Sequence, residues 1–286
     1  MASLGFSNPD HSPHLATDQE RLITESVQAG PEYLEPSRTS QIVAQIRAEL
    51  DRPSTPLGDP KAQRELCSGM PPSRTARSWP SIAVRTRFFD EQVLMAIGAG
   101  LQQIVICGAG YDDRALRFRA LGVRFFELDE PTTQGDKARR LRKMGASTDA
   151  LMLIPVDFRR DDAAKLLRDS GHSAGRPTLF VCEGLLVYLD KHVVSRFLRG
   201  LRSVASPSSI LAASLACRRE GEDPDRVLAI ANASRLTGRM EPWLTILSAS
   251  ECSGLFSKAG WVVDHTSEAG SGSSRLLLVT ALPTSP

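Results

Sequence analysis

The sequence predicts an α/β protein with a mostly parallel sheet, and two observations lead to this prediction. First, short apolar runs recur between segments that have the apolar spacing of helices; the runs are Gln103–Cys107, Val123–Leu128, Leu151–Val156 and Thr178–Cys182. Second, these runs are rich in β-branched or aromatic residues on both faces, as strands covered by helices on both sides are. With 286 residues and 41% hydrophobic content, the chain can bury a full core as one sizeable domain.

The first of these strands runs into a glycine turn. Gln103–Cys107 is followed at once by Gly108, Ala109 and Gly110, and helical spacing starts at Asp112. Two glycines at a strand-to-helix turn let the backbone bend sharply and approach a ligand, because neither carries a Cβ atom. Ligands in open α/β sheets bind at the carboxyl ends of the strands, so this turn is predicted to bind a nucleoside-containing cofactor.

The residues after the glycines separate two classes of cofactor. A dinucleotide-binding turn has a third glycine three positions further on, but Asp113 stands there, beside Asp112. Two carboxylates in the first helical turn suit the helix dipole but repel a diphosphate. They favour a cofactor that is positively charged and carries no phosphate, such as S-adenosyl-L-methionine. An NAD-type oxidoreductase is the alternative.

Acidic residues end the second apolar run. Glu127 and Asp129 flank Leu128, and side chains two residues apart in a strand point to the same side. A carboxylate at this strand end is well placed to accept hydrogen bonds from both hydroxyls of a ribose, although NAD enzymes use an acid in an equivalent place. The alternative is a solvated strand end, because Asp and Glu usually remain in water.

The next two strand ends repeat this pattern. Asp157 and Phe158 follow the third run, where the acid could hold an adenine amino group and the ring could lie on the base. Glu183 and Gly184 follow the fourth run. We expect all of these residues on one rim of the sheet, because the carboxyl ends of parallel strands meet at the same edge.

The rest of the chain predicts further elements around this centre. We expect residues 1–36 to be a flexible N-terminal segment or lid, residues 37–286 to form the main domain, and segment 216–247 to be a substrate cap. The other expected elements are helices at Ser40–Leu50, Phe88–Ile97, Lys191–Val204 and Ser248–Ala259, and strands at Ile210–Leu215, Trp261–His265 and Arg275–Leu282. The last two strands are spaced as a hairpin.

Composition argues against several classes of protein. The net charge is +2 with acids and bases interspersed, which argues against a nucleic-acid surface, and we interpret the basic run Lys137–Lys143 as a solvated helix face. The five cysteines form no C-x-x-C pair, which is typical of a reduced, cytoplasmic protein, and with five scattered histidines they give a metal site little support. No stretch approaches the roughly 20 apolar residues of a membrane span, and the start lacks a signal-peptide core.

Four motifs in register resemble the leucine carboxyl methyltransferase family. They are RTRFFD at Arg85–Asp90, QIVICGAGYDDRALR at Gln103–Arg117, FFELDEP at Phe125–Pro131 and LFVCEGLLVYL at Leu179–Leu189. The resemblance implies a Rossmann-like class I methyltransferase: a seven-stranded, mostly parallel sheet with an antiparallel last strand, helices on both faces and a small helical cap. It also implies an S-adenosyl-L-methionine-dependent O-methyltransferase acting on a carboxyl or hydroxyl oxygen of a small molecule, such as a polyketide or another secondary metabolite.

The resemblance also implies roles for individual residues. Arg87 matches the arginine that pairs with the carboxylate of the cofactor's methionine part, and Glu183 matches an acid near its amino group. The other matches are Gly108 and Gly110 in the cofactor loop, Asp129 on the ribose, and Asp157 with Phe158 around the adenine. The chain departs from the family pattern at Asp112-Asp113-Arg114, where relatives commonly have Asp-Thr-Arg. Lys61 is the only lysine before the core, where the phosphatase-modifying relatives place a lysine on the cofactor.

The acceptor decides whether a base is needed. A carboxylate, with an unperturbed pKa of about 4, is already ionised, whereas a phenol, with a pKa of about 10, needs a base or a stabilising cation. Tyr188 and Glu183 are the candidate catalytic residues, although Tyr188 packing as an ordinary aromatic residue is the alternative. A domain that binds the cofactor without catalysis is a third interpretation, because fold does not fix function. The sequence carries no signal for an oligomeric state.

Overall fold

The computed structural model describes residues 35–72, 80–237, 241–270 and 275–284. The expected N-terminal segment or lid, residues 1–36, therefore lies outside the described residues except for its last two positions. The helices are α2 (Arg38–Ala48), α3 (Ala62–Leu66), α4 (Pro80–Gly98), α5 (Arg114–Arg117), α6 (Pro131–Met144), α7 (Ala163–Asp169), α8 (Lys191–Ser203), α9 (Pro224–Thr237), α10 (Ala249–Lys258) and the 3-10 helix η3 (Leu186–Tyr188). The strands are β1 (Gln103–Cys107), β2 (Arg124–Asp129), β3 (Leu151–Pro155), β4 (Thr178–Cys182), β5 (Ile210–Ala216), β6 (Trp261–Ala269) and β7 (Leu276–Pro283).

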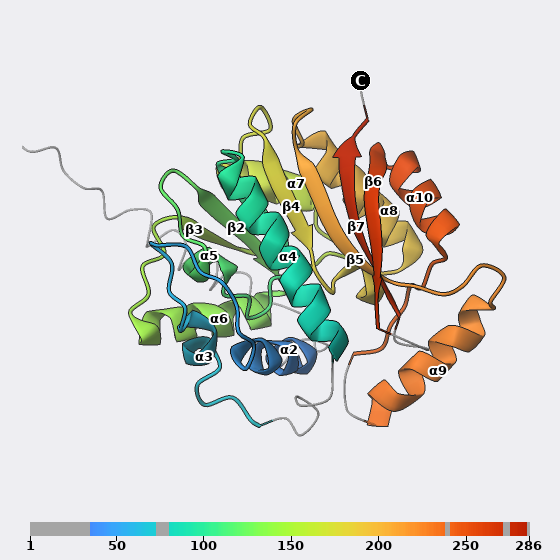
Figure 1. The fold of residues 1–286 in the computed structure, drawn as a ribbon, viewed down its shortest axis with the longest axis horizontal. Helices are drawn as coiled ribbons and strands as arrows, with labels where there is room; N and C mark the ends of the chain where they lie inside the picture. Colours follow the sequence, from blue (N-terminus) through green and yellow to red (C-terminus); the bar gives the residue numbers. More distant parts are fainter. Residues whose placement is uncertain (1–34, 73–79, 238–240, 271–274, 285–286) are drawn as a thin grey trace, which may run out of the picture.

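The seven strands form one sheet in the order β3-β2-β1-β4-β5-β7-β6 (Figure 1). Strands β1 to β5 are parallel to one another, whereas β7 is antiparallel to both β5 and β6. This confirms the expected mostly parallel sheet with an antiparallel last strand. The chain order reverses between β1 and β4, and the carboxyl ends of strands at such a reversal border the usual ligand crevice of open α/β sheets.

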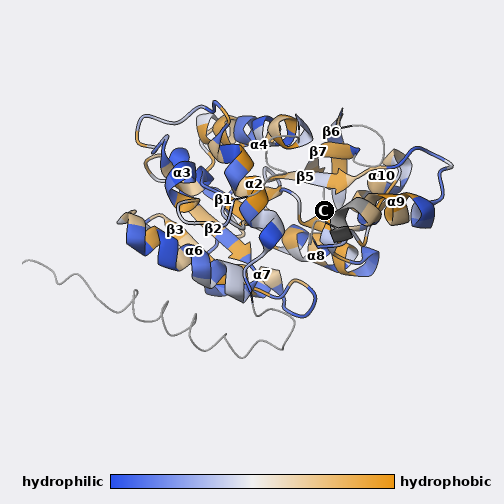
Figure 2. Ribbon diagram, turned by 90° about the horizontal axis from the view of Figure 1, so that it is seen from below, coloured by the Kyte–Doolittle hydropathy of each residue, from blue (hydrophilic) through white to orange (hydrophobic). Residues whose placement is uncertain are grey.

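The sheet separates two hydrophobic cores because side chains alternate along each strand. In β1, Val105 and Cys107 face the layer that contains α7, α8 and α10. Ile104 and Ile106 face the layer that contains α4 and α6. Figure 1 shows α4 in front of the sheet and α8 behind it, and in Figure 2 the strands are mostly hydrophobic in colour, whereas α6 is mostly hydrophilic. Both faces of β1 are therefore buried, which accounts for its continuous apolar run.

Local chemistry fixes where two of the helices begin. At α10, Ser248 Oγ accepts a hydrogen bond from Glu251 N at 3.3 Å, and Glu251 Oε2 accepts one from Ser248 N at 2.9 Å. This is the capping box that the sequence predicts. The helix α4 begins at Pro80, earlier than the predicted start at Phe88. Proline suits a first helical turn, because its missing N–H group would have no partner there.

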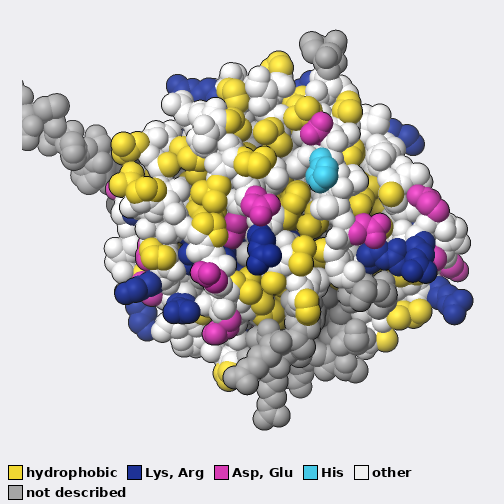
Figure 3. All heavy atoms as spheres, viewed as in Figure 1, with side chains coloured by type: hydrophobic (Ala, Val, Ile, Leu, Met, Phe, Trp, Pro, Cys, Tyr) yellow, Lys and Arg dark blue, Asp and Glu magenta, His cyan; other side chains and the backbone are white. Residues whose placement is uncertain are grey.

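The surface and the cysteines agree with a globular domain. The face seen in Figure 3 mixes basic, acidic and hydrophobic side chains, and no single large basic field covers it. All five cysteines are free. Within the described ranges, no helix combines the length and the apolar character that crossing a bilayer requires. The same residues bring together no cluster of three metal-ligating side chains.

Candidate active site

A large cavity lies at the carboxyl edge of the parallel strands. Its volume is about 1230 Å³, and residues that follow β1, β2, β3 and β4 line it together with parts of α2, α4, η3 and the segment before α10. In Figure 1, α2 and α9 both lie below this edge of the sheet. Of the predicted site residues, those in its wall are Gly108, Ala109, Gly110, Asp129, Phe158, Glu183 and Tyr188.

The glycine turn is pinned to β2 by its backbone. The N–H groups of Gly108 and Ala109 both donate to the carbonyl oxygen of Leu128, at 2.8 and 3.1 Å. Gly108 and Gly110 have φ angles of +68° and +52°, a region that residues with a Cβ atom rarely adopt. A Cβ atom on Gly110 would also lie 2.7 Å from the Cβ atom of Ser40 in α2. Leu128 thus contributes its carbonyl group to the turn, while its side chain is buried in the core.

Asp129 joins the glycine turn to the end of β2. Its Oδ2 atom accepts a hydrogen bond from Gly110 N at 2.5 Å, and its Oδ1 atom accepts one from Glu130 N at 2.8 Å. Burial raises the pKa of Asp129 to about 6, although the two backbone N–H groups act in the opposite direction. The carboxylate is therefore held in a fixed orientation at the cavity wall and keeps lone pairs for a ligand.

Glu127 does not lie in the cavity wall, contrary to the prediction that it would share the ligand side with Asp129. The helix α6 packs over Glu127, and Lys137 of this helix forms a buried ion pair with it. Lys137 Nζ also donates to the carbonyl oxygen of Asp112 at 2.6 Å. The interpretation of the basic run Lys137–Lys143 as wholly solvated is wrong at its first residue, because Lys137 is only 1% exposed.

Asp112 and Asp113 face arginines and not the cavity. Asp112 pairs with Arg114 at 2.5 Å and with Arg47 at 3.3 Å. Asp113 pairs with Arg52 at 2.7 Å and with Arg117 at 2.6 Å. Neither carboxylate is in the cavity wall. Burial acts to raise the pKa of Asp112, but the neighbouring arginines lower it. The expected repulsion between these carboxylates and a diphosphate therefore has no basis in the structure.

Glu183 is the meeting point of three arginines. Arg47 Nη2 lies 2.7 Å from Glu183 Oε1, Arg85 Nε lies 2.9 Å from the same oxygen, and Arg114 Nη1 lies 2.7 Å from Oε2. Burial alone would raise the pKa of Glu183, but the positive charges of Arg47, Arg114 and Arg85 hold it well below its usual range. Glu183, Arg47 and Arg85 all line the cavity.

The arginine of α4 that faces the cavity is Arg85, whereas the family resemblance implied Arg87. Arg87 is exposed and is not in the cavity wall. Residues two positions apart in a helix differ by about 200° around its axis, so the two side chains point to opposite faces. Arg47 was not predicted at all. Its only sequence signal is a place beside Ile46 on the apolar face of an amphipathic helix.

Of the two residues expected around the adenine, Phe158 lies in the cavity wall and Asp157 does not. Phe158 is buried in the cavity wall, and its ring packs edge-on against Phe197 with centroids 5.5 Å apart. Asp157 is outside the wall, because its Oδ1 atom accepts a hydrogen bond from Arg159 N at 2.9 Å in a local turn. Glu130, which was not predicted, lines the cavity beside Asp129. Burial, Asp157 and Asp129 raise the pKa of Glu130 to about 8.

The segment expected to be a substrate cap contributes to the same wall. Ala231 of α9, Trp243 and Leu244 line the cavity together with Tyr188. The backbone of the segment is attached to η3, because the N–H group of Leu244 donates to the carbonyl oxygen of Val187 at 2.8 Å. The structure thus brings this part of residues 216–247 over the same edge of the sheet as the glycine turn.

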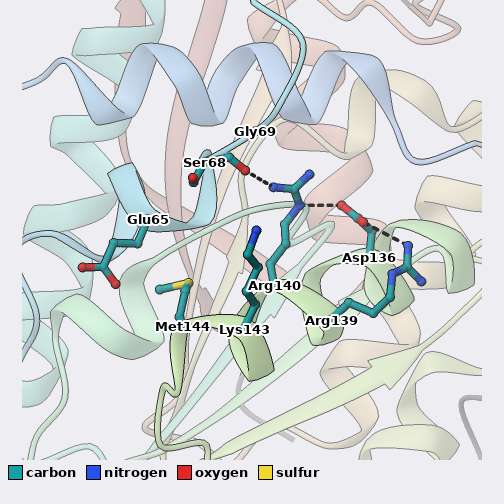
Figure 4. Close-up of a pocket in the computed structure, with 8 residues that line it drawn as sticks. All are labelled: Glu65, Ser68, Gly69, Asp136, Arg139, Arg140, Lys143 and Met144. Carbon is teal, nitrogen blue, oxygen red and sulfur yellow. Dashed lines mark hydrogen bonds and ion pairs between the residues drawn. The ribbon is translucent and has the colours of Figure 1, made fainter.

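A second hollow lies on the other side of α6, beside α3 (Figure 4). Its volume is about 450 Å³, and Arg139, Arg140 and Lys143 contribute to its wall. Arg140 donates to Asp136 at 2.7 Å and to the carbonyl oxygen of Ser68 at 2.8 Å, as the dashed lines in Figure 4 show. Because this guanidinium is engaged in holding α3 against α6, the hollow offers no comparable site.

Comparison with known proteins identifies the family. A model of the family described as leucine carboxyl methyltransferase matches residues 33–202. The chain belongs to this family. A protein of Mycolicibacterium gilvum is 37% identical over 169 residues, which cover 58% of this chain and 51% of that protein. A protein of Streptomyces coelicolor is 33% identical over 206 residues, which cover 65% of this chain and 72% of that protein.

Both relatives are provisionally named S-adenosyl-L-methionine-dependent methyltransferases. The chain spans about half the length of the first curated relatives that it matches. The family match does not favour the alternative of an NAD-type oxidoreductase.

Solved structures show the same fold. A provisionally named methyltransferase from Thermobifida fusca has a TM-score of 0.59 at 14% identity, and the match covers 89% of this chain and 97% of that one. The magnesium protoporphyrin IX methyltransferase of Synechocystis, solved with bound S-adenosylhomocysteine (SAH), has a TM-score of 0.52 at 12% identity, with 78% and 93% covered. The fold of this leucine carboxyl methyltransferase family member is therefore that of the class I methyltransferases.

Proposed function

We propose that this member of the leucine carboxyl methyltransferase family transfers a methyl group from S-adenosyl-L-methionine to an oxygen atom of a small-molecule acceptor. The observation that carries the proposal is one cavity in which the glycine turn, Asp129 and the arginine-held Glu183 face a common space. When bound, S-adenosyl-L-methionine supplies an electrophilic methyl group on a positively charged sulfur. The chain's own residues bind, orient and shield the reactants.

The residues in the wall fit the three parts of this cofactor. Asp129 accepts one backbone N–H group on each oxygen and retains lone pairs for ribose hydroxyls. Phe158 and Glu130 are the ring and the acid available to the adenine. The amino and carboxylate groups of the methionine part find opposite charges at Glu183 and at Arg85 with Arg47. Both signs of charge are thus present where a zwitterion needs them.

The chemistry of the wall favours an acceptor that is already ionised. No His or Lys side chain is among the described residues that line the cavity. Glu183 is a weak base, because three arginines hold its pKa well below the usual range. A carboxylate acceptor needs no base, so a carboxyl oxygen is the first candidate. For a hydroxyl acceptor, Tyr188 in the cavity wall is the candidate base.

The wall also supports a division of the domain. We assign residues 37–286 to the methyltransferase domain and segment 216–247 to an acceptor cap. Ala216, Ala231 and Trp243 from this segment line the cavity. Alignment of the acceptor and exclusion of water can together supply roughly 7–11 kcal/mol of a methyl-transfer barrier, so a closed wall at this place is of direct use to the reaction.

Calorimetric titration tests the cofactor, and mass spectrometry tests the reaction. We expect saturable binding of SAH and none of NADH. We then expect the mass of a carboxylate-containing metabolite to increase by one methyl group after incubation with the protein and the methyl donor. Binding of NADH in place of SAH would contradict the proposal. Binding of SAH with no transfer to any carboxylate or hydroxyl acceptor would support the interpretation of an inactive binding domain.

A further inference from the structure

The cavity continues past the cofactor residues toward β5 and β7. In the sheet, β2 and β1 lie on one side of β4, and β5 and β7 lie on the other. We call the part of the wall beyond β4 the acceptor half; its larger apolar members are Val187, Ala216, Ala231, Trp243, Leu244 and Leu276, and Ser214, Leu215, Pro242 and Gly270 complete it. The whole cavity, about 1230 Å³, exceeds the roughly 300–1,000 Å³ that a single small-molecule site occupies. A second molecule therefore has room beside the cofactor.

The acceptor half is apolar except for the hydroxyl of Ser214, which accepts a hydrogen bond from Gly184 N at 2.8 Å. The arginines of the described wall lie elsewhere: Arg47 and Arg85 meet at Glu183, and Arg159 follows β3. A negatively charged group placed in the acceptor half would leave water without gaining an opposite charge from the described side chains. Burying such an unpaired charge is strongly unfavourable. The wall therefore selects against a negative charge at the far end of the acceptor.

The largest side chain of the acceptor half is held in a fixed position. The amide of Asn232 in α9 binds the backbone of Trp243 twice, with Nδ2 to the carbonyl oxygen at 2.9 Å and the N–H group to Oδ1 at 2.8 Å. Two residues on, Thr245 Oγ1 donates to the carbonyl oxygen of Leu189 at 2.6 Å. The backbone that carries the buried indole of Trp243 is therefore fastened to both α9 and the end of η3.

We propose that the acceptor half binds an uncharged, apolar body of the methyl acceptor, and that Trp243 and Ala231 set the length of this body. The acceptor class is a monocarboxylate or hydroxyl compound whose single oxygen-bearing head lies toward Tyr188, with an alkyl chain or unsubstituted ring behind it. The inference rests on the proposed function, because the molecule bound here is the acceptor of that methyl transfer.

Chain length is the variable that tests the inference. Butanoate, octanoate and dodecanoate are titrated calorimetrically into the SAH-saturated protein, and octanedioate serves as the probe with a charge at its far end. We expect one-site binding that tightens by up to about fourfold for each added methylene until the chain reaches Trp243. Octanedioate should bind much more weakly than octanoate. Equal affinity for these two, or an affinity independent of chain length, would overturn the inference.

Two substitutions should shift, in opposite directions, the chain length at which the affinity stops increasing. Trp243→Ala should let longer chains gain affinity, and Ala231→Leu should stop the gain at shorter chains. Ala229→Leu is the matched control, because Ala229 is exposed on the same helix and should change nothing. An Ala231→Leu variant with the wild-type length limit would contradict the inference, even if Trp243→Ala fails to fold. SAH binding is measured for each protein. If the wild type does not bind SAH, the proposed function is refuted. If it binds SAH but its affinity for carboxylates does not depend on their chain length, this inference alone is refuted.

Discussion

At the scale of single residues, charge pairing decides which side chains the ligand can reach. Asp112, Asp113 and Glu127 are acids near the glycine turn, yet each is buried against a cation of the chain. Asp129 is held by backbone N–H groups, so it keeps its place in the cavity wall. Asp112, Asp113 and Glu127 therefore stabilise the turn from outside the cavity wall, whereas Asp129 lies in the wall.

The two arginines of α4 provide a sharp test at this scale. Arg85→Ala should weaken SAH binding roughly tenfold to hundredfold, because a charge-assisted hydrogen bond to the cofactor is lost. Arg87→Ala should leave the affinity unchanged, because this side chain is exposed outside the cavity. Glu183 keeps Arg47 and Arg114 in the Arg85→Ala protein, so the fold should persist. Calorimetry on both variants checks this, and a larger effect of Arg87→Ala would contradict the site.

Glu130 makes the stability depend on pH in a defined direction. Its pKa is raised to about 8 by burial and by the neighbouring carboxylates of Asp157 and Asp129. The folded protein therefore binds a proton that the unfolded chain has already lost, so its contribution to stability falls as pH rises from about 4.5 to about 8. Glutamine imitates the protonated side chain. The stability of Glu130→Gln should therefore equal that of the wild type at low pH.

Thermal unfolding curves compare Glu130→Gln with the wild type. At about pH 9 the variant should unfold roughly 2–4 °C higher, because it buries no charge. Glu65→Gln, which removes an exposed carboxylate, is the control. If the unfolding temperature of Glu130→Gln is not higher than that of the wild type at about pH 9, the raised pKa of Glu130 is contradicted.

Some residues of the cavity wall could be located from the sequence, because backbone geometry identifies them. Gly108 and Gly110 have positive φ angles, and Asp129 stands at a strand end, so a strand–turn pattern is enough to find them. The sequence did not locate Arg85 and Arg47, because the choice between side chains of one helix depends on how that helix is rotated against the sheet. That rotation is a property of tertiary packing and leaves little trace in a local pattern.

At the scale of elements, an ion pair fastens α6 to β2. Lys137 and Glu127 are both buried, and burial raises the pKa of Glu127 to about 7 while Lys137 acts to lower it. Lys137→Met should lower the free energy of unfolding by about 3 kcal/mol at about pH 8, because it leaves an unpaired buried charge. The loss should be smaller at about pH 6, where protonation neutralises Glu127.

Urea denaturation measures this coupling. Lys143→Met, at an exposed position of the same helix, should change the free energy of unfolding by less than about 0.5 kcal/mol. Adding Glu127→Gln to Lys137→Met should recover most of the lost stability, because no buried charge remains. If the double variant is as unstable as Lys137→Met alone, the ion pair is not what fastens α6.

The bounds of the helices and strands agree with the predicted bounds except where contacts between distant segments change them. The strands β1 and β4 have the predicted bounds, since continuous apolar runs mark both. The helix expected from Asp112 shortens to Arg114–Arg117, where buried arginine pairs hold the chain. The strand β6 continues to Ala269 because it pairs along its length with β7. Ladder pairing with a distant segment cannot be read from local periodicity.

At the scale of the whole molecule, the strand order places two groups of cavity residues on opposite sides of β4. The glycine turn and Asp129 follow β1 and β2, whereas Trp243, Ala231 and Leu276 lie beyond β4 at the same edge. The sequence predicted the sheet and this edge, because motifs at successive strand ends must meet there. The reason given for a phosphate-free cofactor was wrong, and the family match supports that cofactor on other grounds.

The crystal structure of the protein with SAH tests the central claim most directly. We predict that the ribose hydroxyls lie on Asp129, the homocysteine carboxylate on Arg85, and the sulfur toward the acceptor half of the cavity. Well-ordered SAH at any other place in the molecule, or in this cavity with its ribose away from Asp129, would contradict the account.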